Sequence, residues 1–300
     1  MHKVGISLVT LQATYGDKRA IEIASEIGAD TIDLNLDPQD YRNVNSVYSK
    51  GDDYVFDYYE KLGEYARSLG LEVSQTHGQV TGFKNIKDED DALVENIRLD
   101  LLATGALKSP VCVVHNATSI HLGPTPDPQL MYKLSYDMFS RTIPYAKRYG
   151  VKIATETFGD AVRFNACDFF GNIAEFKKVY SDIKSLDEFK DHFTICVDTG
   201  HSNKAMRYNN PTPADVIREL GSEVTVLHLN DNDTLTDQHK IPMTGVIDWN
   251  DVFNALDEIG YSGVYNMELA LDFFGKDFQI QTAEFAVKLL KHYILKRYGN

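Results

Sequence analysis

The stretch VLHLND at residues 226–231 decides the interpretation of the fold, because an apolar run of β-strand character ends there in polar residues. Five further segments have the same form and reach a side chain that can bind a metal: VSQTH at 73–77, CVVH at 112–115, ATET at 154–157, CVDTGH at 196–201 and NMELA at 266–270. In an eight-stranded (β/α) barrel the carboxyl ends of the strands meet at one mouth, where catalytic residues lie. We therefore expect these scattered side chains to share one pocket.

Short β-rich runs alternate with helix-like runs along the whole chain. Strands are expected at 3–10, 31–36, 71–77, 111–116, 151–157, 193–199, 224–230 and 263–269. These runs are apolar on both faces, as buried parallel strands are. Amphipathic helices are expected between them, for example at 17–28 and 249–260.

Glycines punctuate this alternation and support an α/β fold. Five expected helices end in a glycine suited to the left-handed conformation that stops a helix: Gly28, Gly70, Gly150, Gly221 and Gly260. Eight βα units predict one (β/α)8 TIM barrel domain spanning residues 1–300, with its active site at the C-terminal strand ends. The long segments after strands are expected to line the mouth: 38–55, 78–88, 158–170 and 231–248.

Composition excludes several classes of protein. The net charge of −14 disfavours nucleic acid and anionic membranes as partners. No apolar run reaches 18 residues, so no transmembrane helix is expected, and the N-terminal MHKVGISLVT shows no signal peptide. Three cysteines without a spacing motif predict no disulfide framework and fit a reducing cytoplasm. The 17 tyrosines and 15 phenylalanines leave a homo-oligomer open.

Four strand-end residues form the first candidate site: Glu156, Asp198, His228 and Glu268. Each has an ordinary explanation when taken alone. An ion pair between strands would account for either glutamate, a helix cap for Asp198, and a hydrogen-bonded core position for His228. Because all four end strands of one barrel, together they predict a mixed carboxylate and imidazole site, which suits Zn²⁺, Mn²⁺ or Co²⁺ better than Ca²⁺.

Four more residues near strand ends have the ligand types of a second site. His77 and His115 end adjacent strands, and Asp237 and His239 form a D-Q-H sequence in a long loop. Hydrogen bonding of the two histidines to loop backbone and solvation of the loop pair are the alternatives. No nucleophile signature of the Ser/His/Asp or Cys/His kind and no glycine-rich phosphate loop is visible.

At this point the sequence resembles the xylose-isomerase-like (β/α) barrel superfamily, which includes ketose epimerases, sugar isomerases, inosose dehydratases and the endonuclease IV type of DNA-repair enzyme. The resemblance spans nearly the whole chain. It rests on a strand-5 Glu (Glu156), an Asp-x-x-His after strand 6 (Asp198 and His201), a strand-7 His (His228) and a strand-8 Glu (Glu268). The run HLNDNDTLTDQHKIPMTGVIDW at 228–249 is similar to the strand-7 segment of sugar isomerase and epimerase members.

The resemblance also implies a polynuclear alternative. Endonuclease IV has further metal ligands at positions that correspond here to His77, His115, His201, Asp237 and His239. One to three divalent ions are therefore expected. Three segments depart from the repair enzymes where those enzymes approach DNA: TFGDAVRFN at 157–165, SNKAMRYNN at 202–210 and HKIPMTG at 239–245.

Three hypotheses follow for function. The first is a metal-dependent isomerase or epimerase of a small carbohydrate, in which Glu156 and Glu268 move a proton through an enediolate. In this hypothesis His201 and Arg163 bind the substrate. The second is a polynuclear zinc phosphodiesterase of the endonuclease IV type, and the third is a sugar-binding barrel without catalysis. The sequence does not select the sugar, its phosphorylation or the metal.

Overall fold

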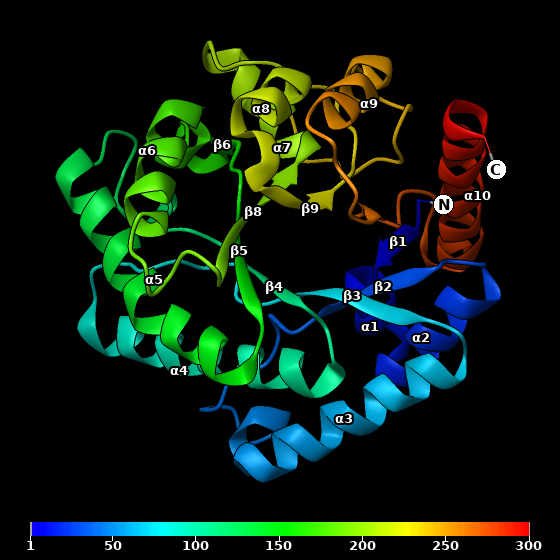
Figure 1. Ribbon diagram of the computed structural model, residues 1–300, viewed down its shortest axis with the longest axis horizontal. Coiled ribbons are helices and arrows are strands. Elements are labelled where there is room, and N and C mark those ends of the chain that lie inside the picture. The colour runs from blue at the N-terminus through cyan, green and yellow to red at the C-terminus, as the bar shows by residue number, and fades with distance from the viewer. Residues whose placement is uncertain (1, 300) are drawn as a thin grey trace.

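The computed structural model describes residues 2–299 and contains an eight-stranded parallel sheet that curves into a barrel (Figure 1). The order of hydrogen-bonded strands is β10-β1-β2-β3-β4-β5-β8-β9. The sheet closes between β9 and β10 through one bridge, Leu229 to Met267, where Leu229 N donates to Asn266 O at 2.8 Å. The predicted (β/α)8 TIM barrel is confirmed, with a narrow seam between its last two strands.

The strands lie where the sequence places them. Their bounds are β1 Val4–Ser7, β2 Thr31–Asn35, β3 Glu72–His77, β4 Val111–Val114, β5 Lys152–Glu156, β8 Phe193–Asp198, β9 Val224–His228 and β10 Tyr265–Met267. The extension of the first strand to residue 10 is wrong, because helix α1 (Val9–Tyr15) begins there. Leu8 and Leu11 are both fully buried, so the apolar run continues with the spacing of a helix and not of a strand.

Helices surround the barrel on its outside (Figure 1). Besides α1 they are α2 Asp17–Glu26, α3 Asp52–Ser68, α4 Lys87–Leu107, α5 Pro128–Tyr149, α6 Ile173–Lys184, α7 Thr199–Ala205, α8 Pro213–Leu220, α9 Trp249–Glu258 and α10 Gln279–Tyr298. All five glycines expected after helices have positive φ, from 59° at Gly221 to 81° at Gly70. Within residues 2–299, no helix combines the length and apolarity that a membrane crossing requires.

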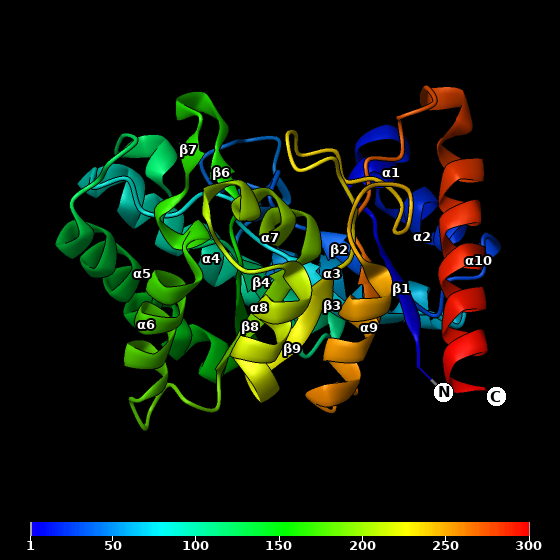
Figure 2. The same cartoon turned by 90° about the horizontal axis from the view of Figure 1, so that it is seen from above.

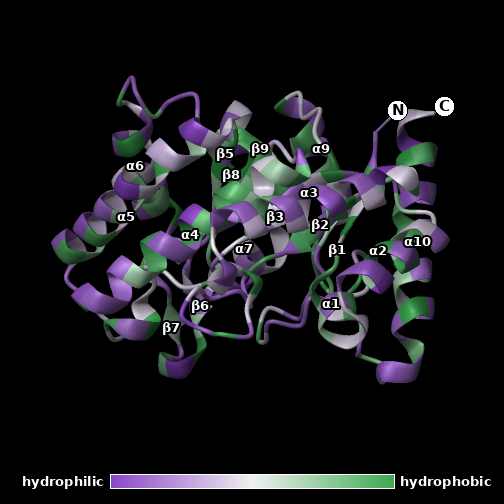
Figure 3. Cartoon of the chain, turned by 90° about the horizontal axis from the view of Figure 1, so that it is seen from below, coloured by the Kyte–Doolittle hydropathy of each residue, from purple (hydrophilic) through white to green (hydrophobic). Residues whose placement is uncertain are grey.

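Two apolar layers hold the barrel together. The large outer core joins the helices to the strands, and hydrophobic residues mark the strands in Figure 3. A small second cluster fills the barrel interior: Val111, Val113, Ala154, Cys196 and Val226. Such interior layers make a TIM barrel a packed body and not a pore, so ligands are left to the mouth.

The long connections gather at one end of the barrel. The small hairpin of β6 (Asp160–Ala161) and β7 (Ala166–Cys167), the loop 231–248 and the segment after β10 all rise on the same side in Figure 2. The two chain ends lie together at the opposite side. The mouth therefore lies at the carboxyl ends of the strands, as expected.

Candidate functional site

The predicted strand-end residues converge at the mouth. His77, Glu156, Asp198 and His228 are the last residues of β3, β5, β8 and β9, and Glu268 directly follows β10. His115 directly follows β4 in the same way. Parallel strands in register bring these positions to one level, although their separation in sequence reaches almost 200 residues.

The first candidate site forms a compact group. Glu156, Asp198, His228 and Glu268 each offer one ligand atom, and these atoms lie within 4.8 Å of one another. His228 Nδ1 lies 3.2 Å from Glu156 Oε2 and 3.4 Å from Glu268 Oε2. All four residues are buried or nearly so, which places their charges in a medium of low dielectric constant.

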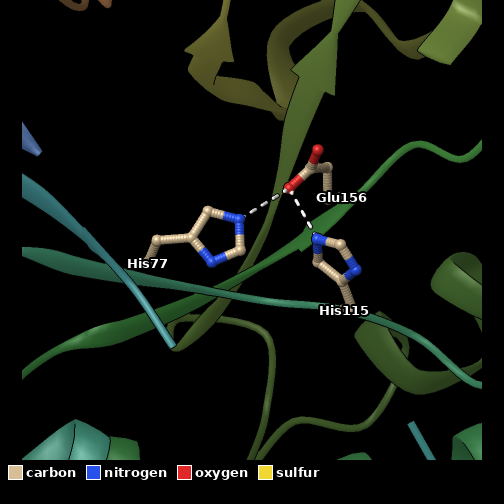
Figure 4. A group of neighbouring side chains, drawn as sticks. All are labelled: His77, His115 and Glu156. Atoms are coloured by element: carbon tan, nitrogen blue, oxygen red, sulfur yellow. Dashed lines mark ion pairs between the residues drawn. The ribbon is translucent and has the colours of Figure 1, made fainter. Parts of the chain in front are cut away.

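A second group shares Glu156 with the first. His115 Nε2 and His77 Nε2 lie 3.2 Å and 3.5 Å from the same oxygen, Glu156 Oε2 (Figure 4). Figure 4 shows the two imidazoles pointing at that carboxylate from neighbouring strands. Glu156 therefore faces two groups of ligand atoms, as a bridging carboxylate does.

The third group comes from two connections and not from strand ends. His201 Nε2 and His239 Nε2 each lie 3.5 Å from Asp237 Oδ2. His201 lies in α7 because Asp198 caps that helix, accepting a hydrogen bond from His201 N at 2.6 Å. The Asp-x-x-His spacing is thus the geometry of a helix cap, which places both side chains at the mouth.

Backbone carbonyls fix the orientation of three of these histidines. The Nδ1 atoms of His77, His201 and His239 lie 3.0–3.2 Å from the carbonyl oxygens of Gly78, Thr157 and Glu268, respectively. A hydrogen bond from Nδ1–H leaves Nε2 as the atom with the free lone pair. In all three rings Nε2 faces a carboxylate, which is the orientation of a metal ligand.

Asp33 in β2 belongs to the site and was missed from the sequence. Its Oδ2 lies 3.3 Å from His228 Nε2 and accepts hydrogen bonds from Gln75 Nε2 and Asn266 Nδ2. The carboxylate lies beside Nε2, and Nδ1 on the other side of the ring faces the two glutamates. The available signal was a charged residue inside the buried run TIDLN, since a buried carboxylate requires a partner.

Asp231 organises the loop 231–248 that carries Asp237 and His239. Its carboxylate accepts hydrogen bonds from Met243 N, Ile247 N and Trp249 Nε1, at 2.8–3.2 Å. Gly245 passes so close that a Cβ there would lie 2.2 Å from Asp231 Oδ1. These contacts explain the D-N-D and G-V-I-D-W parts of the motif as one folded unit.

The ligand atoms of Glu156 and His228 lack directed hydrogen bonds. Among residues 2–299, both carboxylate oxygens of Glu156 and both ring nitrogens of His228 are buried without a properly directed hydrogen bond. Buried polar atoms of this kind are costly unless something satisfies them. Lone pairs that converge from carboxylates and imidazoles fit a divalent cation of the zinc, manganese or cobalt type.

The pKa values of the metal-free cluster reflect the same convergence. Burial would raise the pKa of Glu156, but the imidazoles of His228 and His115 lower it well below its usual range. Burial would lower the pKa of His77, but the carboxylates of Glu156 and Glu268 raise it to about 9. Without metal, Glu156 is therefore an ionised carboxylate, and the His77 imidazole beside it is protonated at neutral pH.

Two further residues, Arg163 and Cys196, are not part of the three groups of candidate ligands described above. Arg163 is exposed and lies in a short 3-10 turn between β6 and β7, and it is not among the candidate ligand groups. Cys196, a fully buried residue of the barrel interior, lies within the same 4.8 Å limit of Glu156 and His228. In the metal-free protein, burial raises the pKa of its thiol to about 12, so the thiol is neutral there.

Comparison with known proteins points to one family. The family model described as "Xylose isomerase-like TIM barrel" matches residues 21–282. The inosose isomerase of Bacillus subtilis is 29% identical over 166 residues, which are 53% of this chain and 53% of that protein. The chain spans about half the length of the curated relatives it matches.

Solved structures share the fold at low identity. A D-tagatose 3-epimerase-like protein superimposes with a TM-score of 0.70 at 20% identity, covering 97% of this chain and 99% of the other. The IOLI protein with a bound zinc atom superimposes with a TM-score of 0.71 at 17% identity, covering 98% and 97%.

Proposed function

The chain belongs to the xylose isomerase-like TIM barrel family, and we propose that it is a metal-dependent isomerase or epimerase of a small carbohydrate. The observation that carries the proposal is the approach of Glu156 Oε2 and Glu268 Oε2 to one atom, His228 Nδ1, at 3.2 and 3.4 Å. Two carboxylates that approach one site from different strands can act on a bound substrate from two directions, one removing a proton and the other returning it. The family match and the likeness to inosose isomerase support the substrate class.

Glu156, Asp198, His228 and Glu268 would hold the cation. A divalent ion bound there supplies Lewis-acid polarisation of a substrate carbonyl. The orphaned atoms of Glu156 and His228 support this assignment, and the zinc atom in the IOLI protein favours zinc. Further ions at the other two groups, His77 with His115 and His201 with Asp237 and His239, are part of the same proposal of one to three ions.

The two glutamates carry the proton. One of them removes the proton on the carbon next to the carbonyl, and the other returns a proton to the opposite face or to the neighbouring carbon. Burial opposes ionisation, but nearby imidazoles lower the pKa of both Glu156 and Glu268, so each is ionised at neutral pH. His201 would bind a substrate hydroxyl, and Arg163 would contact the substrate from the hairpin.

Proton exchange tests this proposal. We would incubate the metal-loaded protein with a panel of ketoses in deuterated water and follow deuterium at the carbon next to the carbonyl by NMR. Net isomerisation or epimerisation that is lost in both Glu156→Gln and Glu268→Gln supports the proposal, and exchange without conversion in one of the two variants identifies the remaining glutamate as the base that removes the proton. Conversion at the wild-type rate in either variant, with metal still bound, rejects the two-glutamate mechanism.

A second candidate function has its own support. The complete set of three ligand groups around Glu156 also suits a polynuclear zinc phosphodiesterase of the endonuclease IV type. A polynuclear zinc centre supplies a hydroxide nucleophile at neutral pH. The net charge of −14 opposes DNA as the substrate. EDTA-sensitive incision of duplex DNA at an abasic site would establish this function in place of the first.

A further inference from the structure

A pocket with aromatic walls lies beside the mouth and has no role in the proposed chemistry. We call it the phenylalanine pocket. Its volume is about 630 Å³, and its lining includes Lys240, Ile241, Ala270, Phe274, Phe278 and Phe285. These three phenylalanines are 69%, 55% and 55% exposed, and Phe273, which also lines the pocket, is 51% exposed. Apolar surface gathered in this way marks a binding site more often than scattered hydrophobic residues do.

Two chain segments that carry candidate ligands also form part of the wall of this pocket. Lys240 follows the candidate ligand His239, and Ala270 lies two residues after Glu268. Ala270 N donates to His239 O at 2.9 Å, and His239 Nδ1 lies 3.2 Å from Glu268 O. The segments 239–240 and 268–270 thus contribute both to the candidate site and to the phenylalanine pocket. A molecule bound at Glu268 therefore lies next to this pocket.

The side chains that line the phenylalanine pocket indicate which kind of molecule it binds. Small-molecule pockets are concave, mostly apolar, roughly 300–1,000 Å³ in size and equipped with few polar groups. The phenylalanine pocket fits that description, with Lys240 Nζ 6.0 Å from the ring centre of Phe273. Lys240 makes no salt bridge with any residue in the range 2–299, so its charge is available to a polar substituent at the rim.

We propose that the phenylalanine pocket binds an apolar, non-reacting group attached to the carbohydrate. The substrate class is then a glycoside or related conjugate that carries an aromatic substituent and has a keto group on its sugar ring, because the proposed reaction needs a carbonyl that an ordinary glycoside lacks. This inference rests on the proposed function of the neighbouring site. Binding energy from such a remote group helps to orient the reacting carbons.

Matched ligand pairs test the inference by equilibrium binding without turnover. The probes are 4-nitrophenyl and methyl glycosides of four common pyranoses, titrated calorimetrically into the metal-loaded protein. We expect the nitrophenyl member to bind about tenfold more tightly for at least one sugar, which corresponds to ~1.4 kcal/mol. Phe274→Ser and Phe278→Ser should remove that preference and leave methyl glycoside binding unchanged. Phe56→Ser, at a position 40% exposed on the outer helix α3, is the matched control.

Three outcomes would overturn the inference. The two members of every pair could bind alike, including the case in which neither binds. The preference could survive both phenylalanine substitutions. Sedimentation could show a dimer that Phe274→Ser dissociates, without any aryl preference, which would assign the pocket to a second copy of the chain. An aryl preference without proton exchange in any ketose or aryl keto-glycoside would instead keep the pocket and reject the proposed reaction.

Discussion

Replacing Asp33 by Asn should weaken metal binding although Asp33 is not a proposed ligand. The carboxylate lies 3.3 Å from His228 Nε2, and Nδ1 of that ring faces Glu156 and Glu268. Asn has nearly the same shape, so Gln75 and Asn266 can keep a hydrogen-bond acceptor at this position. The substitution therefore removes mainly the negative charge behind the ring.

The expected loss of metal affinity follows from the distance between the Asp33 carboxylate and the His228 ring. Two unit charges 3.3 Å apart interact by about 5 kcal/mol at an effective dielectric constant of ~20. A metal-bound imidazole is neutral and presents only the partial charge of its N–H, so a fraction of that energy is expected. Loss of such a carboxylate behind a ligand typically costs about 10–100-fold in metal affinity, or ~1.4–2.8 kcal/mol.

Competition with a chromophoric chelator measures this loss directly. Metal-free wild-type protein and the Asp33→Asn variant are titrated with zinc, and Asp257→Asn, which alters an outer ion pair with Arg297, is the control. We expect a loss of tenfold or more in the first variant only. Equal zinc affinity in wild type and Asp33→Asn would show that Asp33 does not act through His228.

Three further predictions concern pH, the mouth loop and a buried ion pair. In the metal-free protein the pKa of His77 is raised to about 9, so its protonated form stabilises the fold below pH ~6.5 and this contribution is lost as the pH rises through 9. Zinc must displace that proton, so zinc affinity should rise over the window in which the metal-free protein loses stability, and two flat profiles would contradict this. Asp231→Ala leaves the donors of Met243, Ile247 and Trp249 unpaired, at about 1–3 kcal/mol each, so urea unfolding should show a loss of at least ~3 kcal/mol. Lys204→Met breaks a pair with Asp160 whose side chains are both 3% exposed, and should cost about 3–5 kcal/mol in the same assay; a loss below ~1 kcal/mol would refute it.

The barrel and most of the candidate site were predictable for one physical reason. A buried parallel strand must be apolar, and its first polar residue marks the point where it leaves the core. That rule located His77, Glu156, Asp198 and His228 at strand ends, and the number of strands implied closure. It also brought Asp237 and His239 to the mouth, since the loop that carries them follows such a strand.

The other features of the fold and of the site depend on contacts between residues far apart in the sequence, which no local sequence pattern encodes. Asp33 lies inside its strand, and its partner His228 is nearly two hundred residues away. The strand-like run at 8–10 becomes a helix because the sheet ends at Ser7. Asp231 looked like one polar residue of a loop until its three backbone and indole donors were in place. The phenylalanine pocket combines residues from two connections and one helix, so only the fold reveals it.

Metal content per chain, determined by elemental mass spectrometry after reconstitution and removal of free metal, tests the central claim most directly. The account predicts at least one zinc, manganese or cobalt ion per chain, lost in Asp198→Ala and in Glu156→Ala and kept in the Asp257→Asn control. A wild-type protein that retains no divalent metal, or a Glu156→Ala variant that retains all of it, would contradict the account.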